Sequence, residues 1–323
     1  QDDPCQNDAT STMSFMGVKC TCDAISCRTA MLVLPCGNLK GPLPSQLSGL
    51  RELTELDVKN NHLSGIIPPS LAELSKMQYL ILHRNSLSGP IPKALGSLSN
   101  MVNLYLEENM LTGHIPRELG NLVNMKELTL YQNSISGTIP SDLGNATALT
   151  SLAFSENSLT GKIPKELGKL VNLEYLYLHS NSFHGNIPAE LGNLIQLQEL
   201  YLLSNSLTGP IPSEIGQLVS LQYFVARENY LSGRIPKSLG NLVSMVDIIL
   251  DTNALTGPIP EELRSLSKLR YLILYNNAFT GRLPKALGSL TSLQFLDLCA
   301  NALTGPIIPQ LFQLTTLKLI DLS

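Results

Sequence analysis

The sequence is poor in aromatic residues and in charge. It has no tryptophan, and only 5% of its 323 residues are aromatic and 15% charged, with a formal net charge of -4. Without an excess of basic residues, the electrostatic basis for binding nucleic acid or an anionic membrane is missing. No run of about 18 apolar residues occurs, so we expect no membrane contact by this segment. Because 43% of the residues are hydrophobic, we expect most of the chain to fold around a core.

The sequence also lacks the signatures of catalysis and of cofactor binding. It contains no P-loop, no G-x-G-x-x-G after a predicted strand and no metal-binding motif. The five histidines are scattered, so they do not predict a shared metal or nucleophile. The adjacent acids Glu107 and Glu108 could act in glycoside hydrolysis, but we expect a solvated charge pair at a strand edge. We therefore predict no cofactor, no metal and no enzymatic activity.

An internal repeat dominates the sequence. Asparagine recurs every 24 residues from Asn61 to Asn301, without an insertion or a deletion. Glycine follows four residues after each of these asparagines, and proline seven residues after, except that Ile308 takes the proline position in the last unit. The frame extends one unit backwards, where Gly37 replaces the asparagine, so the chain has twelve units. A fixed period of this length indicates a solenoid.

Each unit combines a short strand, a turn and a return segment. In the unit around Asn133, apolar residues alternate with polar ones up to Leu130, which predicts a strand. The asparagine amide can satisfy turn backbone that would otherwise be buried unpaired, so we expect stacked units to form a polar ladder. Gly137 permits the turn, Pro140 favours an extended return segment, and a short helical turn closes the unit.

The pattern L-x-x-L-x-L-x-x-N-x-L-[ST]-G-x-I-P resembles that of plant-type leucine-rich-repeat proteins over residues 30 to 323. The resemblance implies an α/β solenoid, a right-handed superhelix of twelve 24-residue units with a parallel strand ladder on the concave face. We expect one continuous array in which neighbouring units share a core. The expected divisions are a cysteine-containing cap at 1–29, repeats at 30–316, and the start of a further repeat at 317–323 without a C-terminal cap.

Four cysteines crowd the amino-terminal segment, which resembles the cap of secreted plant repeat proteins. They are Cys5, Cys20, Cys22 and Cys27. Clustered cysteines at a domain end suggest an oxidising compartment. Among three connectivities we favour Cys5–Cys20 with Cys22–Cys27, and a zinc site is the alternative.

Two further cysteines and one glycosylation sequon are also informative. Cys36 and Cys299 are left over, and an intermolecular bridge, a pairing of Cys36 within the cap and a free thiol at Cys299 all stay open. The single N-glycosylation sequon begins at Asn145, in a segment that we expect to be accessible.

Five side chains of each unit, at 7, 6, 4, 2 and 1 residues before the asparagine, should face solvent beside the strand leucines. We call the surface that they form the ladder face. Nine of the ten tyrosines lie in these columns, and Tyr175, Tyr177, Tyr201 and Tyr223 should form one patch. Tyrosine supplies contact area at low conformational cost, although its preference for strands also explains the pattern.

The charges of the same columns suggest a ligand class. Acidic residues outnumber basic ones in units four to ten, with basic residues on both flanks, which suits a ligand carrying positive charge or many hydroxyl groups. Some receptors of the family that the chain resembles hold a peptide carboxylate with an Arg-x-Arg pair, which is absent here. The candidate ligand-binding residues are Tyr105, Glu107, Tyr131, Tyr175, Tyr177, His179, Tyr201, Tyr223, Arg227, Asp251, Tyr271 and Tyr275.

The resemblance implies the ectodomain of a receptor-like kinase or receptor-like protein, which binds a peptide or protein ligand on the concave face. Carbohydrate is a further ligand class, and a co-receptor or self-association is a further partner. The expected location is extracellular or at the cell surface. Two other functions stay open, namely a secreted inhibitor of a cell-wall-degrading enzyme and a structural subunit of an extracellular fibre or wall.

Overall fold

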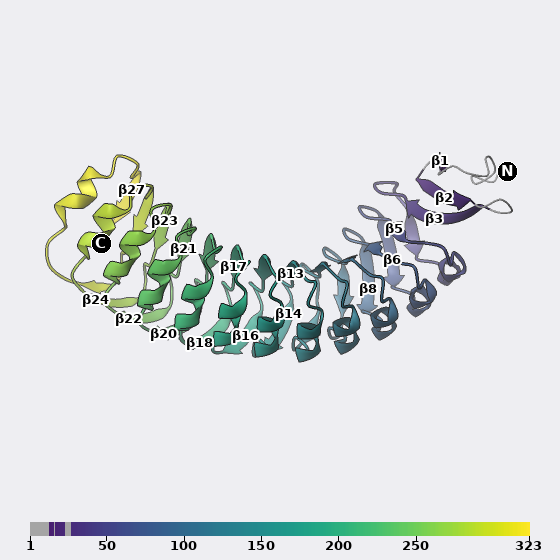
Figure 1. Cartoon of the computed structure of the whole chain (residues 1–323). Coiled ribbons are helices and arrows are strands. Elements are labelled where there is room, and N and C mark those ends of the chain that lie inside the picture. Colours follow the sequence, from purple (N-terminus) through teal and green to yellow (C-terminus); the bar gives the residue numbers. More distant parts are fainter. Residues whose placement is uncertain (1–12, 16, 23–26) are drawn as a thin grey trace. The chain divides into compact units, whose positions relative to one another are not determined.

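The computed structural model describes residues 13–15, 17–22 and 27–323. The chain divides into two compact units, Gln1–Ser158 and Leu159–Ser323, and the boundary falls inside a repeat rather than in a linker. Each unit is described by itself. Within each, Figure 1 shows successive coils stacked side by side with their strands and helical turns in register.

A parallel strand ladder runs through each unit, with one three-residue strand per coil after the first. The first unit contributes β3 (Cys27–Val33), β5 (Glu55–Asp57), β7 (Tyr79–Ile81), β9 (Asn103–Tyr105), β11 (Glu127–Thr129) and β13 (Ser151–Ala153). The second contributes β15 (Tyr175–Tyr177), β17 (Glu199–Tyr201), β19 (Tyr223–Val225), β21 (Asp247–Ile249), β23 (Tyr271–Ile273), β25 (Phe295–Asp297) and β27 (Leu319–Asp321). Pairing keeps each side-chain column in line, as where Tyr177 lies opposite Tyr201.

A second set of short parallel strands follows the asparagines. In the first unit these are β4 (Lys40–Pro42), β6 (His62–Ile66), β8 (Ser86–Pro90), β10 (Met110–Thr112) and β12 (Ser136–Gly137). β14 (Ser158–Gly161) spans the boundary, and the second unit adds β16 (Ser182–Gly185), β18 (Ser206–Pro210), β20 (Tyr230–Gly233), β22 (Ala254–Gly257), β24 (Ala278–Gly281) and β26 (Ala302–Leu303).

A five-residue 3-10 helix closes each coil, as the Leu-Gly-x-Leu pattern predicts. In the first unit these are η1 (Ser45–Gly49), η2 (Pro69–Glu73), η3 (Lys93–Ser97), η4 (Arg117–Asn121) and η5 (Ser141–Asn145). The second has η6 (Lys165–Lys169), η7 (Ala189–Asn193), η8 (Ser213–Gln217), η9 (Lys237–Asn241), η10 (Glu261–Ser265), η11 (Lys285–Ser289) and η12 (Pro309–Gln313). In the described part of the chain, no helix has the length and apolar character to cross a bilayer.

The predicted polar ladder of asparagines is confirmed. The Asn205 amide donates to the carbonyls of Leu178, Leu202 and Leu203 at 3.1 to 3.2 Å, and its oxygen accepts from Phe183 N at 3.0 Å. One side chain thus satisfies four backbone groups, two of them on the preceding coil. Since unpaired buried backbone groups are costly, this explains why asparagine recurs at the bend.

The residue before each ladder asparagine adopts a left-handed conformation, with φ between 50° and 55°. This bend directs two successive N–H groups at the next coil. Ser204 N donates to Arg227 O at 3.0 Å and Asn205 N donates to Glu228 O at 3.3 Å. The position is filled by residues such as Arg84, Glu108 and Thr252, for which this conformation is uncommon, so the coil-to-coil bonds impose it.

The core is built from the repeated leucine, isoleucine and proline-flanking positions. Leu176 and Leu178 of one coil are fully buried, as are the equivalent residues of its neighbours. Phe154, Phe183, Phe224 and Phe279 replace leucine at four such positions and are also fully buried. These four phenylalanines therefore fill the core, while nine of the ten tyrosines lie in the columns of the ladder face.

An antiparallel hairpin precedes the ladder at the amino end. β1 (Met13–Phe15) pairs with β2 (Val18–Cys22), which pairs with β3 and sets Cys22 opposite Cys27 in the backbone register. Cys20 is fully buried and disulfide-bonded. Its predicted partner Cys5 lies outside the described residues, so the favoured pairing stays a prediction.

Candidate functional site

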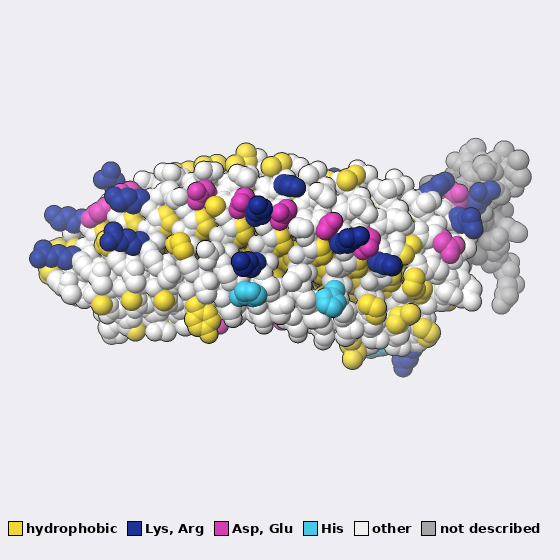
Figure 2. All heavy atoms as spheres, turned by 90° about the horizontal axis from the view of Figure 1, so that it is seen from below, with side chains coloured by type: hydrophobic (Ala, Val, Ile, Leu, Met, Phe, Trp, Pro, Cys, Tyr) yellow, Lys and Arg dark blue, Asp and Glu magenta, His cyan; other side chains and the backbone are white. Residues whose placement is uncertain are grey.

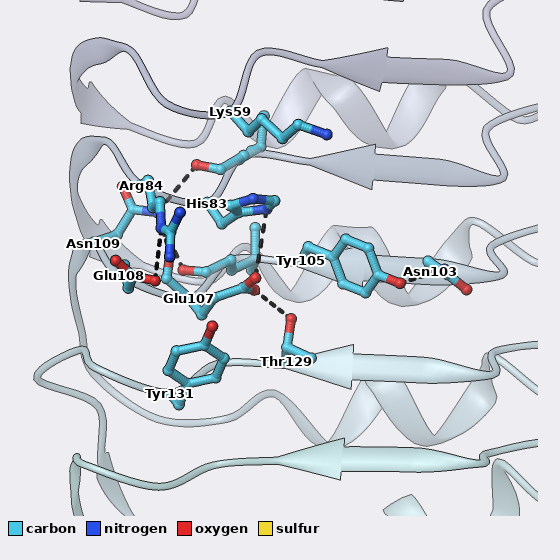
Figure 3. A network of polar contacts seen from close by, with 12 residues as sticks. Lys59, His83, Arg84, Asn103, Tyr105, Glu107, Glu108, Asn109, Thr129 and Tyr131 are labelled. Atoms are coloured by element: carbon cyan, nitrogen blue, oxygen red, sulfur yellow. Dashed lines mark hydrogen bonds and ion pairs between the residues drawn. The ribbon is translucent and has the colours of Figure 1, made fainter. Parts of the chain in front are cut away.

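A polar network centred on Glu107 lies on the ladder face of the first unit (Figure 3). Glu107 follows β9, and its carboxylate accepts a hydrogen bond from the hydroxyl of Thr129 in β11. His83, which follows β7, approaches from the other side, with Nδ1 3.4 Å from Glu107 Oε1. Three successive strands therefore position the three groups, since all lie in columns facing the same side of the sheet.

Burial controls the electrostatics of this network. Only 7% of Glu107 is exposed, and burial raises the pKa of its carboxyl against the opposing effect of the Thr129 hydrogen bond. Burial also lowers the pKa of His83, and Lys59 lowers it further. Both shifts disfavour an ion pair. The expectation of a solvated Glu107–Glu108 pair is therefore wrong for Glu107, because its neighbours in the columns cover it.

Two basic residues expected before the acidic part of the ladder face are paired with acids. Lys59 Nζ lies 3.0 Å from Asp57, which is itself buried, and Arg84 Nε lies 2.8 Å from Glu108. Figure 3 shows the Arg84 and Glu108 side chains turned toward each other at one edge of the ladder. These pairs reduce the positive charge that the first unit offers to an anionic ligand.

Tyr105 and Tyr131 are the two tyrosines of the first unit that the sequence analysis selected as ligand-binding candidates. The Tyr105 hydroxyl accepts from Asn103 Nδ2 at 2.6 Å and donates to Glu127 at 2.7 Å. Burial, followed by the hydrogen bond to Glu127, raises the pKa of Tyr105 well above its ordinary value. Burial also raises the pKa of Tyr131. Both rings are half-buried and stay protonated at neutral pH, so each offers a neutral surface.

Four aromatic side chains of the second unit form a cluster on the ladder face, which we call the tyrosine cluster. Tyr175 and Tyr177 stack with centroids 6.3 Å apart, and Tyr177 meets Tyr201 edge-on at 5.3 Å. His179 contacts both Tyr177 and Tyr201, at 6.5 and 6.0 Å. The predicted patch therefore includes Tyr175, Tyr177 and Tyr201 and gains His179, which the patch prediction had omitted.

The tyrosine cluster is anchored by a carboxylate. The Tyr177 hydroxyl donates to Glu199 at 2.8 Å. Burial and this bond raise the pKa of Tyr177, and burial together with Glu199 raises the pKa of Tyr201 to about 12. Tyr223 lies in register with Glu199 on the adjacent strand, at the side of the cluster away from Tyr177. The sequence analysis did not select Glu199, although its spacing of 22 residues from Tyr177 matches that of Glu127 from Tyr105.

The remaining candidate residues of the second unit surround β21. Asp251 has no exposed surface, which contradicts the expectation that its column faces solvent. Burial raises the pKa of Asp251, while a hydrogen bond from Tyr275 and the charge of Arg227 lower it. Tyr271 stacks on Phe295 with centroids 4.7 Å apart and nearly parallel planes. The structure thus gathers Arg227, Asp251 and Tyr275 in one column, beside a separate aromatic pair.

Side chains before the ladder asparagines also pair from coil to coil, which the sequence analysis missed. Gln132 Nε2 donates to Glu156 at 2.9 Å, and the Ser204 hydroxyl donates to Glu228 at 2.7 Å. All of these positions have the left-handed conformation described above. Their residue types gave little signal, because glycine occurs at none of these positions and asparagine only at Asn60 and Asn276.

The side chains outside the ladder face are of mixed charge. Figure 2 shows lysine and arginine beside aspartate and glutamate on the face that it presents, consistent with pairs such as Lys237–Glu262 at 2.9 Å. Asn145 of the sequon is exposed at the end of η5. Cys36 is exposed and Cys299 half-buried, and both are free thiols. Burial and the nearby Asp297 raise the pKa of Cys299, which lowers its reactivity.

Comparison with known proteins identifies the repeat. Models of leucine-rich repeats match residues 28–87 and, as six separate copies, residues 100–122, 124–146, 148–170, 172–194, 196–218 and 268–290, which is more than half of the chain. The chain belongs to the leucine-rich-repeat family. The predicted plant-type repeat and the solenoid with a parallel strand ladder are thereby confirmed. A comparison with curated proteins gives no match.

Several solved leucine-rich-repeat structures are similar to this one. The plant peptide hormone receptor RGFR1, solved in complex with RGF2, is 34% identical with a TM-score of 0.83 over 95% of this chain and 56% of the receptor. The ectodomain of the Arabidopsis receptor kinase HAESA, solved with an IDA peptide hormone, is 30% identical with a TM-score of 0.74 over 88% and 52%. A plant ice-binding protein is 28% identical with a TM-score of 0.64 over 80% and 85%. The chain thus spans just over half the length of both receptors.

Proposed function

We propose that this leucine-rich-repeat chain is an extracellular recognition module of the receptor ectodomain type, which binds a peptide or protein ligand on its ladder face without chemical turnover. The similarity to two peptide hormone receptors supports the class of function. We place the binding site at the tyrosine cluster. In a chain with so few aromatic residues, Tyr175 and Tyr201 both contact Tyr177 on one face.

The tyrosine cluster has the properties of a binding surface. Its rings are half-buried, so each keeps an exposed edge while its position is fixed by neighbours. The Tyr177 hydroxyl is held by Glu199, which reduces the conformational freedom that binding would remove. Large, rigid and amphipathic side chains of this kind dominate the energetics of many interfaces.

The proposed extracellular location is supported by two further features. Cys20 is disulfide-bonded, which agrees with an oxidising compartment. Asn145 of the single sequon is exposed and therefore accessible to glycosylation. We accordingly propose a disulfide-bonded glycoprotein of the secretory pathway.

Selection from a peptide library tests the proposal. The chain is immobilised, and N-acetylated, C-amidated dodecapeptides of random sequence are selected on it. The selected peptides are then titrated by calorimetry against the unmodified chain, the Tyr177→Ala/Tyr201→Ala variant and a Tyr230→Ala control. Tyr230 is 66% exposed on β20, outside the ladder face, so it controls for the loss of an exposed ring.

The expected result is at least about a tenfold loss of affinity in the double variant, because it removes two adjacent anchors. The control should retain full affinity. Equal binding by all three proteins would show that the tyrosine cluster is not the binding site. Failure to select any peptide would overturn the peptide-binding function itself.

A further inference from the structure

Asp247 occupies an unusual position on the ladder face of the second unit. It begins β21, and the strand register places it between Tyr223 of β19 and Tyr271 of β23. All three residues lie in the same column, six residues before their asparagines. The carboxylate therefore has an aromatic residue on each neighbouring strand, about 4.8 Å away along the hydrogen-bonding direction.

An apolar column runs beside this acid. Two residues further along the three strands lie Val225, Ile249 and Ile273. Val225 is buried, while the two isoleucines are half-buried and keep some exposed surface. An aliphatic stem lying across Ile249 would thus contact hydrocarbon before its end reached Asp247.

The Asp247 carboxylate has no side-chain hydrogen-bond donor among the described residues, whereas three other ladder-face acids of the unit each have one. Glu174 accepts from Gln198, Glu199 from Tyr177 and Glu228 from Ser204. In contrast, Oδ1 of Asp247 is buried and has no hydrogen-bond partner among the residues that the structure describes. Buried polar atoms are rarely left in this state, so a water molecule or a ligand group from outside the chain should complete it.

The nearby cation Arg270 points toward Tyr271 and Gln294 rather than toward Asp247. The Arg270 guanidinium lies over the ring of Tyr271, 5.8 Å from its centroid, and Nη2 is 3.5 Å from Gln294 Oε1. Its charge opposes the effect of burial, which raises the pKa of Asp247 to about 6. The Tyr271 ring therefore already takes a guanidinium on its face, while the carboxylate beside it stays without a direct ion pair among the described residues.

A second carboxylate, two residues after the end of β21, adds negative charge. Asp251 lies four residues after Asp247 and in a column of the same face, fully buried. Its Oδ1 also has no hydrogen-bond partner within the described ranges, while Oδ2 lies 3.4 Å from the Thr252 hydroxyl. β21 and the residues just after it thus place two carboxylates on the ladder face, of which Asp251 also receives a hydrogen bond from Tyr275.

We infer that Tyr223, Asp247, Ile249 and Tyr271 form a subsite for one basic side chain, lysine or arginine, of an extended peptide. The aliphatic stem would pack on Ile249, the Tyr223 ring would contact the cation, and the carboxylate would supply the missing ion pair. Tyr271, which already stacks on Phe295 and lies under the Arg270 guanidinium, would bound the subsite on the far side of Asp247. We call these four residues the cationic subsite. The inference rests on the proposed function, because it assigns the charge of the ligand at one place on the ladder face.

Fixed-position peptide pools test the cationic subsite. The probes are N-acetylated, C-amidated dodecapeptides whose central residue is arginine, lysine, citrulline or glutamate and whose other positions are drawn from alanine, leucine, serine, tyrosine and proline. Retention of each pool on the immobilised chain is measured at about 0.15 M salt, where distant charges are screened. Citrulline is the matched neutral probe for arginine.

Three variants are compared with the unmodified chain. Asp247→Asn removes the charge with little change in shape, and Arg270→Gln removes the competing cation. Glu190→Gln removes one negative charge from exposed residue 190 in η7, outside the ladder face, and is the control for net charge. Thermal unfolding of each variant confirms that it is folded before its retention is measured.

The unmodified chain should retain the arginine pool at least about tenfold more strongly than the citrulline pool. Asp247→Asn should bring that ratio near one, Glu190→Gln should leave it unchanged, and Arg270→Gln should increase it, which no folding defect would cause. Retention of all pools alike by the unmodified chain would overturn the subsite and leave the proposed function standing. An unchanged ratio in Asp247→Asn would overturn it as well, and retention of no pool would overturn both.

Discussion

Tyr177 donates its hydroxyl to Glu199 at 2.8 Å, diagonally from one ladder strand to the next. The strand register pairs Tyr177 with Tyr201 and Tyr175 with Glu199, so the bond crosses two residues along the strand direction. Tyr105 and Glu127 make the same bond at 2.7 Å in the first unit. In both cases the acceptor follows 22 residues after the tyrosine. This is the 24-residue repeat minus the two residues that separate side chains on the same face of a strand.

Removal of this hydroxyl should destabilise the second unit. We expect Tyr177→Phe to lower the free energy of unfolding by about 1 kcal/mol, because a half-buried carboxylate loses a donor. Since the fold raises the pKa of Tyr177, the stabilisation should be present below about pH 10 and lost as the pH rises further. Urea unfolding at pH 7 measures the change. An equal loss in Tyr230→Phe, whose hydroxyl belongs to an exposed side chain, would contradict this explanation.

The asparagine ladder should contribute more than any single surface contact. Asn205→Ala removes four hydrogen bonds and takes the acceptor from the Phe183 N–H, while the three carbonyls each keep one other donor. We therefore expect a loss of about 2 to 4 kcal/mol. Asn193→Ala at the exposed end of η7 is the matched control and should change stability by less than about 0.5 kcal/mol. Similar losses in both variants, measured by urea unfolding, would show that the ladder does not carry this stability.

The raised pKa of Asp247 predicts a pH-dependent effect on stability. Because its folded-state pKa is about 6, above the unfolded value of about 3.9, the native state binds more protons and should lose stability as the pH rises through this window. Asp247→Asn should therefore be about 1 kcal/mol more stable than the unmodified chain at pH 7 and closely similar at pH 4. Thermal melts across pH 4 to 7 measure the difference. An advantage that does not change with pH would contradict burial of the charged carboxylate as its cause.

Thiol labelling should separate the cysteines into two classes. We expect maleimide to modify only Cys36 and Cys299 in the denatured, unreduced chain, and all six cysteines after reduction. In the native chain Cys36 should react faster, because Cys299 is half-buried and its pKa is raised. Mass spectrometry counts the labels. Labelling of the cap cysteines by chelator treatment alone would instead indicate the zinc site.

The sequence predicts the fold because each 24-residue repeat corresponds to one coil of the solenoid. Asn205 and its equivalents imply the turn and its hydrogen bonds, and the strand leucines imply the ladder. The site is less predictable, since a column assignment does not reveal what covers a side chain. Glu107 and Asp251 are buried, although most other residues of their column, such as Tyr131 and Arg227, are only half-buried. Whether Arg84 meets Glu108 or a ligand depends on side-chain conformations that no sequence spacing specifies.

The hydrogen bonds of the ladder asparagines also affect how the number of repeats can change during evolution. The ladder asparagines bond backbone groups in the residues before them with a repeated spacing. Asn229 shows it, with bonds to groups 2, 3, 22 and 27 residues earlier, in Arg227, Ala226, Leu207 and Leu202. Duplication or loss of one 24-residue segment joins equivalent positions and recreates the same set of bonds at the junction. Recombination within such a gene can therefore lengthen or shorten the array by whole coils without breaking its frame. It would thereby change which ladder-face residues become neighbours, and new combinations of side chains would arise on an unaltered backbone.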